Sequence, residues 1–181
     1  MKKMTESHSP LTPADGASAA AELNRRGDLV EFDIKAKLPV LVPRAITWAE
    51  AREHEALKDG NPLTLEGLAL ALSVGVARPE LVRIAVVKTL PLPDDPELRF
   101  AALQTGLLGP NMVGLTLGCA VFICHGHENA RVLSHELRHV HQYETAGSIA
   151  DYLPVYIQQI VELGYWNAPF EIDARAREIA A

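Results

Sequence analysis

The segment VLSHELRHVHQYE at residues 132–144 holds the residue types best suited to metal chemistry, namely His135, Glu136 and His139. Two histidines at i and i+4 of a helix lie on one face, so both imidazoles can bind the same metal ion. Glu136 lies beside that face, where its carboxylate can reach a metal-bound water without becoming a ligand. The spacing therefore predicts a zinc site with Glu136 as the general base.

The apolar residues of the same segment indicate how this helix is oriented. Leu133, Leu137 and Val140 fall on the side opposite His135 and His139. We therefore expect the leucine side to pack into the core and the two imidazoles to face solvent or a cleft.

A catalytic zinc site usually has three protein ligands and one water, so a third ligand should come from later in the chain. His141 is excluded because it points away from the face that carries His139. Glu171, in the segment YWNAPFEIDARARE, is the predicted third ligand, although its place near a helix N-terminus could also reflect the helix dipole. Asp173 is expected to face water or an arginine, and Glu162 is the second alternative.

Other residues near these segments have simpler interpretations. The sequence CHGH at residues 124–127 is not followed by a second Cys/His pair at zinc-finger spacing, so we interpret it as a loop. Within this loop, His127 could still lie near the cleft. Trp166 and Phe170 flank Glu171 and are expected to pack into the core. Ala174, one turn after Glu171, is small enough to let another helix approach closely.

Composition limits the classes of protein to consider. Of 181 residues 48% are hydrophobic and 22% are charged, which is enough apolar material for a folded core. The net charge of -6 is a poor match for nucleic acid or an anionic membrane. No apolar run approaches the roughly 20 residues of a membrane-spanning helix, and no signal-peptide core follows the first lysines, so a cytoplasmic protein is expected. Cys119 and Cys124 should lie on opposite faces of one strand as reduced thiols.

The rest of the chain has to position the predicted metal-binding segment. Hydrophobic periodicity and capping residues predict an α+β fold, with a small mixed sheet packed with helices. Residues 1–27 are expected to be a disordered tail, and residues 28–181 a single domain. Thr47 is predicted to cap a helix that ends at Gly60. Pro154 and Pro169 should each lie in a first helical turn. The predicted strands are residues 29–34, 38–42, 82–88 and 118–124, and the predicted helices are 47–58, 64–73, 96–105, about 128–146, 154–163 and 168–181.

The motif SHELRHVHQYE, followed by NAPFEIDA, resembles the zincin-like metallopeptidases of the gluzincin type. More narrowly, it is similar to small bacterial one-domain proteins of unknown function that carry a HELxHxxQ helix and a later Pro-x-Glu helix. The resemblance is best from about residue 114 to residue 176. It implies a zincin-like fold in which the strand at 118–124 borders the substrate cleft. About 40 residues follow the motif, fewer than in well-studied gluzincins, which implies a smaller cleft.

The resemblance also assigns roles to residues. It implies that His135, His139 and Glu171 hold Zn²⁺ and that Glu136 activates water, so the expected function is a zinc-dependent hydrolase, a metallopeptidase acting on a peptide or protein. Candidates to stabilise the oxyanion are Tyr143, Tyr156 and Tyr165.

Two alternatives to a general peptidase stay open at this point. One is a catalytically inactive zincin-like binding module, in which zinc is structural or absent. The other is an effector or toxin component that cuts one partner protein. In a variant of the second, the segment before about residue 45 could cover the cleft.

Overall fold

A four-stranded mixed sheet with the strand order β1-β2-β4-β3 lies at the centre of the fold. The computed structural model describes residues 33–179, so the predicted tail at residues 1–27 and most of the predicted strand at 29–34 lie outside the described residues. β2 and β4 are parallel, whereas β3 is antiparallel to β4 and forms one edge of the sheet. The strands are β1 (Asn61–Pro62), β2 (Arg83–Val87), β3 (Gly114–Leu117) and β4 (Ala120–Cys124).

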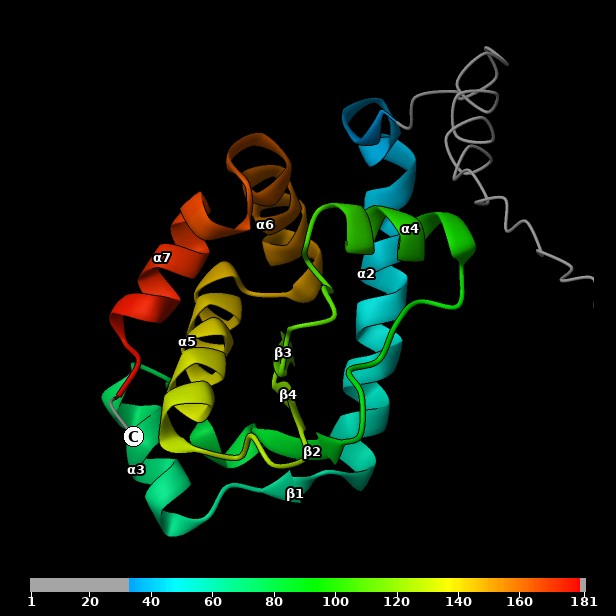
Figure 1. Cartoon of the computed structure of the whole chain (residues 1–181). Helices are drawn as coiled ribbons and strands as arrows, with labels where there is room; N and C mark the ends of the chain where they lie inside the picture. Colours follow the sequence, from blue (N-terminus) through cyan, green and yellow to red (C-terminus); the bar gives the residue numbers. More distant parts are fainter. Residues whose placement is uncertain (1–32, 180–181) are drawn as a thin grey trace, which may run out of the picture. The chain divides into compact units, whose positions relative to one another are not determined.

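Six α-helices surround this sheet in the described part of the chain, and α2 and α5 flank it on its two sides (Figure 1). The α+β class with a small mixed sheet is confirmed, while the zincin-like topology stays a prediction. The helices are α2 (Ile34–Asp59), α3 (Leu65–Ser73), α4 (Pro96–Gln104), α5 (Ala130–Ala146), α6 (Ile149–Leu163) and α7 (Pro169–Ala176), with the short 3₁₀ helices η1 (Pro79–Leu81) and η2 (Tyr165–Asn167).

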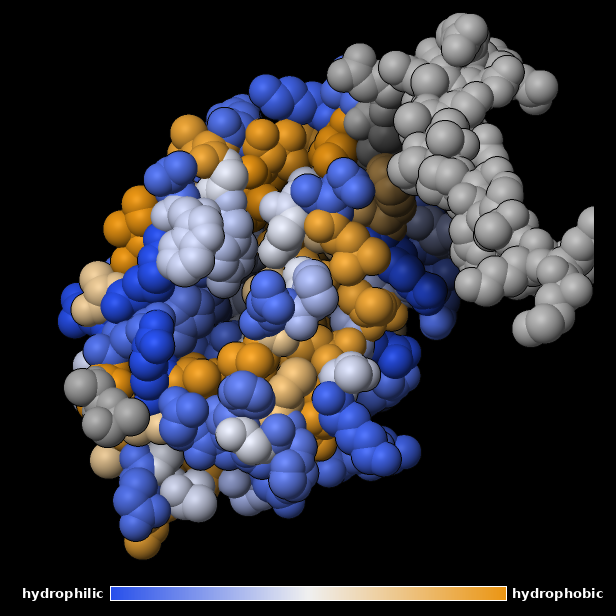
Figure 2. Space-filling view, viewed as in Figure 1, coloured by the Kyte–Doolittle hydropathy of each residue, from blue (hydrophilic) through white to orange (hydrophobic). Residues whose placement is uncertain are grey.

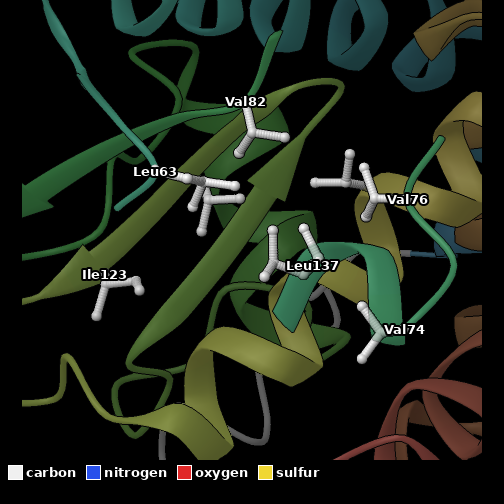
Figure 3. Close-up of a cluster of buried hydrophobic side chains, with 9 residues drawn as sticks. Leu63, Val74, Val76, Val82, Ile123 and Leu137 are labelled. Carbon is white, nitrogen blue, oxygen red and sulfur yellow. The ribbon is translucent and has the colours of Figure 1, made fainter. Parts of the chain in front are cut away.

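A cluster of buried apolar side chains fills the space between the sheet and α5 (Figure 3). Val121 and Ile123 of β4 belong to this cluster together with Leu137 and Val140 of α5, and each is at most 1% exposed. The apolar face predicted for the helix is thus confirmed. Thr116 of β3 pairs with Val121, and directly paired residues project from the same face of a sheet. Thr116 therefore projects toward α5.

The segment at residues 38–42, predicted as a strand, lies inside the long helix α2. Its local alternation is overridden because Leu41, Ala45 and Ala49 recur at helical spacing and are buried. The predicted cap Thr47 also lies inside α2, where its hydroxyl donates to the carbonyl oxygen of the residue four positions earlier, 3.1 Å away. Both predictions are wrong, although α2 does end just before Gly60.

The turn-rich stretch before residue 118 contains β3, a strand that the sequence does not predict. A tight turn joins β3 to β4, with Gly118 at a φ of 60° and the Cys119 amide donating to the Glu53 carboxylate over 2.8 Å. The predicted strand at 118–124 therefore begins only at Ala120, and Cys119 lies in the turn. Both cysteines are free thiols, as predicted.

The remaining elements follow their predicted order with shifted ends. α6 begins at Ile149 after the cap Ser148, so Pro154 lies inside this helix and not in its first turn. Pro169 does occupy the first turn of α7, which ends at Ala176 and does not continue to the C-terminus. No helix within residues 33–179 is long and apolar enough to span a membrane.

Candidate metal centre

Side chains of α5 and α7 converge on one point beside the sheet. His135 and His139 come from α5, and Glu171 comes from the first turn of α7. The Nε2 atoms of the two histidines lie 3.2 Å apart, and oxygens of Glu171 lie 3.2 Å from His139 Nε2 and 3.5 Å from His135 Nε2. The three potential ligand atoms all lie within 4.8 Å of one another. The fold thus brings together the three residues predicted as ligands, whose role as ligands stays a prediction.

Close packing of the two helices makes this convergence possible. Ala174, one turn after Glu171, is fully buried where α7 packs against α5, in agreement with the expectation for a small residue. The side chains of His135, His139 and Glu171 are 13%, 8% and 1% exposed. The imidazoles therefore face a nearly enclosed pocket and not open solvent.

The outer nitrogen of each imidazole is held by an acceptor. His135 Nδ1 lies 3.1 Å from Glu178 Oε1, and His139 Nδ1 lies 2.8 Å from Gln142 Oε1. A carboxylate and an amide oxygen can only accept, so both histidines carry their proton on Nδ1. A neutral ring in this tautomer has a free lone pair on Nε2, as ligation of a metal ion through Nε2 requires.

A hydrogen-bond network fixes the orientation of the Gln142 amide. Its nitrogen donates to Asp173 Oδ2 over 2.8 Å, while Tyr152 donates to its oxygen over 2.9 Å. Asp173 in turn accepts two hydrogen bonds from Arg138, at 2.7 and 3.1 Å. Asp173 thus faces an arginine, as predicted, and indirectly holds the orientation of His139.

The donor set fits a divalent cation better than it fits the protein alone. Glu171 Oε2 is buried and accepts no hydrogen bond from the described residues, with the nearby Arg175 nitrogen 3.6 Å away. Ligand atoms about 2.0–2.2 Å from a tetrahedral zinc ion stand about 3.3–3.6 Å apart. The two Nε2 atoms, 3.2 Å apart, lie close to that separation, and each lies within 3.5 Å of a Glu171 oxygen, Oε1 for His139 and Oε2 for His135. Two imidazoles with one carboxylate are also a common ligand set of catalytic zinc.

Glu136 lies in the same pocket, against β3, and is 5% exposed. Thr116 Oγ1 donates to Glu136 Oε2 over 2.7 Å. On the other side, a Cβ added to Gly114 would lie 2.2 Å from Glu136 Oε1, so a larger residue at this position would displace the carboxylate. The edge strand therefore holds Glu136 through a hydroxyl donor and a glycine.

Burial and neighbouring charges shift the proton affinities of the pocket. Burial raises the pKa of Glu136 above its ordinary value, and the charge of Glu171 adds to this effect, while the two histidines and Thr116 lower it. Burial alone would lower the pKa of His135, but its acidic neighbours raise it overall. Burial alone would raise the pKa of Glu171, yet its contacts with the histidines and Tyr156 bring it well below the usual range. Glu136 is thus the better proton acceptor of the two carboxylates.

The three candidate tyrosines occupy different positions around the pocket. Tyr156 donates a hydrogen bond of 2.6 Å to Glu171 Oε1. Tyr143 is 5% exposed, and its ring centroid lies 3.9 Å from that of Tyr152. Tyr165 lines the pocket that contains His135, His139 and Glu171, called the metal pocket below for its predicted role, and it also lines a wider cleft next to this pocket.

A cleft of about 590 Å³ opens beside the metal pocket, between the segment that leads into β3 and the start of α5. Trp166 lines this cleft and is 72% exposed, so its predicted place in the core is wrong. The short turn η2 between α6 and α7 projects the indole outward, where the Arg175 guanidinium lies 5.0 Å from its ring centroid. Phe170 does pack inward, stacked on Tyr152 with ring centroids 4.8 Å apart.

The remaining candidates lie away from the metal pocket. His141 bonds to the carbonyl oxygen of Gly75, and Glu162 bonds to Gln158. His127 is exposed and lines a neighbouring hollow. Within residues 33–179 no group of three His, Cys, Asp or Glu side chains other than the one in this pocket is close enough to hold a metal.

Several residues that shape the site are not selected by the sequence analysis. Gly114 and Thr116 lie in the unpredicted strand β3, and Glu178 lies two turns after Glu171, a spacing that could have suggested a shared helix face. Gln142 lies one turn after His139, a spacing at which its amide oxygen can accept from the imidazole.

Comparisons of the chain with known protein families, with curated proteins and with solved structures give no match.

Proposed function

We propose that this protein is a zinc-dependent hydrolase of amide bonds, a metallopeptidase in the broad sense. The observation that carries the proposal is the convergence of two Nε2 atoms and a buried carboxylate oxygen that has no hydrogen-bond partner among residues 33–179, with a second carboxylate of raised pKa in the same pocket. A cleft of about 590 Å³ adjoins the pocket and has the size of a substrate site.

His135, His139 and Glu171 would hold the zinc ion. Zinc bound there would act as a Lewis acid toward a water and a substrate carbonyl. Glu136 would accept a proton from the attacking water and transfer it to the leaving amine, because its buried carboxylate has a raised affinity for protons. Tyr165 lines both the pocket and the cleft, so it is the tyrosine best placed to donate to the developing oxyanion.

Metal analysis of protein purified without added zinc, combined with a peptide-library digest, tests the proposal. We expect one equivalent of zinc in the wild type and in Glu136→Gln, and a loss of at least about 100-fold in turnover in Glu136→Gln. Glu162→Gln is the matched control, since Glu162 is an exposed carboxylate on α6. Undiminished turnover by Glu136→Gln would remove Glu136 from the mechanism, and protein without metal would refute the site itself.

A further inference from the structure

A second cavity lies on the other side of β3, between the sheet edge and the helices α2, α4 and α6. In Figure 1 the segment that leads from α4 to β3 runs between α6 and α4, and Leu107 and Leu108 of this segment line the cavity. Its walls are almost wholly hydrocarbon. They include Leu38, Leu41, Leu98, Leu153, Ile157 and Val161.

Small residues on two facing helices leave this space open. Ala45 of α2 and Ala101 and Ala102 of α4 line the cavity, and each is 7% exposed. The cavity measures about 70 Å³, several times the roughly 10–15 Å³ that a single water needs. Cavities lined in this way stay dry and bind apolar ligands.

The apolar cavity and the metal pocket share a wall. Leu107, Leu115, Thr116, Tyr143 and Tyr156 line both spaces. The Thr116 hydroxyl donates to Glu136 and the Tyr156 hydroxyl to Glu171, so the polar ends of two wall residues belong to the metal pocket. A ligand that occupied both spaces would have a polar reacting end beside Glu136 and an apolar chain.

We propose that the cavity binds the aliphatic chain of an acylated substrate, and that the bond cut is the amide between a short-chain acyl group and an amine. This assignment of a substrate class rests on the hydrolase function proposed above. In the reaction, water adds its oxygen to the acyl carbon, the C–N bond breaks, and a proton goes to the nitrogen, so that a carboxylic acid and a free amine are released. An aliphatic chain suits the space because hydrocarbon side chains from three helices surround it and offer no charged partner.

Apolar side chains are also exposed on the outer surface of these helices. Figure 2 shows hydrophobic residues at the surface over α6 and over the chain that leaves α4. Among the exposed side chains of the two helices are Phe100, Leu103, Val155 and Leu163, each between 42% and 48% exposed.

A chain-length series tests the inference. Amides of a fluorogenic amine with acyl chains of two, four, six, eight and twelve carbons are offered to the zinc-loaded full chain. Burial of one methylene contributes about 0.8 kcal/mol, so we expect kcat/KM to rise about fourfold per methylene until the cavity is filled, and then to level off. A flat series with measurable hydrolysis would overturn the acyl-chain assignment and leave the hydrolase intact.

Binding without turnover separates this inference from the function on which it rests. A fluorescent fatty-acid analogue should bind Glu136→Gln and metal-free protein, and alkyl carboxylates should displace it with the same dependence on chain length. If the chain binds in this way while no amide is hydrolysed, the cavity assignment holds and the hydrolase proposal fails. Displacement by aromatic acids as efficient as by alkyl acids would overturn the assignment to an aliphatic chain.

Filling the cavity is the third part of the test. Ala45→Phe should reduce kcat/KM for the eight-carbon substrate to about that of the two-carbon substrate, while zinc content stays at one equivalent. Ala51→Phe is the matched control, because Ala51 lies on the same helix with its side chain exposed. Should Ala45→Phe fail to fold, the smaller filling change Ala102→Leu from the facing helix should shorten the preferred chain by at least two carbons. An unchanged chain-length preference in a folded filling variant would refute the proposal.

Discussion

Glu178 offers a sharp test of how the metal pocket is organised. Its carboxylate accepts from His135 Nδ1 over 3.1 Å and is itself held by Arg131 Nε at 2.6 Å. The amide of the next residue, Ile179, donates to Ser134 Oγ over 3.0 Å, which fixes the end of the described chain against α5. These contacts should orient the His135 ring, keep the proton on Nδ1 and make Nε2 a stronger ligand.

Glu178→Gln keeps the shape of this side chain but removes its charge. Carboxylate partners of ligand histidines typically change metal affinity by about 10- to 100-fold. The Glu178 side chain is 19% exposed and forms an ion pair with Arg131, which weakens its effect on the imidazole. We therefore expect the lower part of that range, about 10- to 30-fold weaker zinc binding. His139 has a neutral partner in Gln142, so the loss should be confined to the His135 side of the site.

The assay is competition for zinc between the protein and a chromophoric chelator at neutral pH, with thermal unfolding of the metal-free proteins measured in parallel. Glu162→Gln is the control, because it removes an exposed carboxylate on α6 that is bonded to Gln158. Equal zinc affinity of Glu178→Gln and the control, within about twofold, would refute the proposed role of Glu178 in orienting the ligand. A large fall in the unfolding temperature of metal-free Glu178→Gln would instead indicate a structural role.

Three further predictions address the pocket and its surroundings. Gly114→Ala should lower kcat by about tenfold or more with zinc content unchanged, since the new Cβ would meet Glu136 Oε1; full activity would contradict the close approach of the strand. The hydrogen bond from Arg138 lowers the pKa of Asp173, so the ionised Asp173 should stabilise the fold fully above pH about 4, and this stabilisation should be lost as the pH falls through the lower folded pKa. In urea unfolding between pH 2 and 6, the unfolding free energy of Asp173→Asn should lack this pH-dependent contribution. The same dependence of the unfolding free energy on pH in the wild type and in Asp173→Asn would refute the prediction. Free zinc at about 100 times its dissociation constant should stabilise the fold by about 2.7 kcal/mol, or roughly 5–10 °C in Tm, and an unchanged Tm after chelation would argue against binding to the folded protein.

The helix that carries His135 and His139 could be predicted from sequence because its determinants are local. Leu137 and Val140 recur at helical spacing opposite His135 and His139, and Asn129 and Gly147 cap the two ends. The long helix α2 could not be recognised in the same way. Its apolar residues near 38–42 fit an alternating pattern as well as a helical one. Only the burial of Leu41, Ala45 and Ala49 along one side of α2 in the folded protein decides between the two patterns.

Spacing along the chain determined that His135 and His139 could share a helix face, and the need for a third ligand selected Glu171, two helices further on. Tertiary structure alone decided that Glu171 meets the histidines, that Gly114 lets Glu136 lie against the edge strand, and that an apolar cavity adjoins the pocket. It also decided that Trp166 faces outward. The physical reason is that periodicity within one helix reports only on neighbours three or four residues away, whereas these features depend on how α7, β3 and α2 pack against elements distant in sequence.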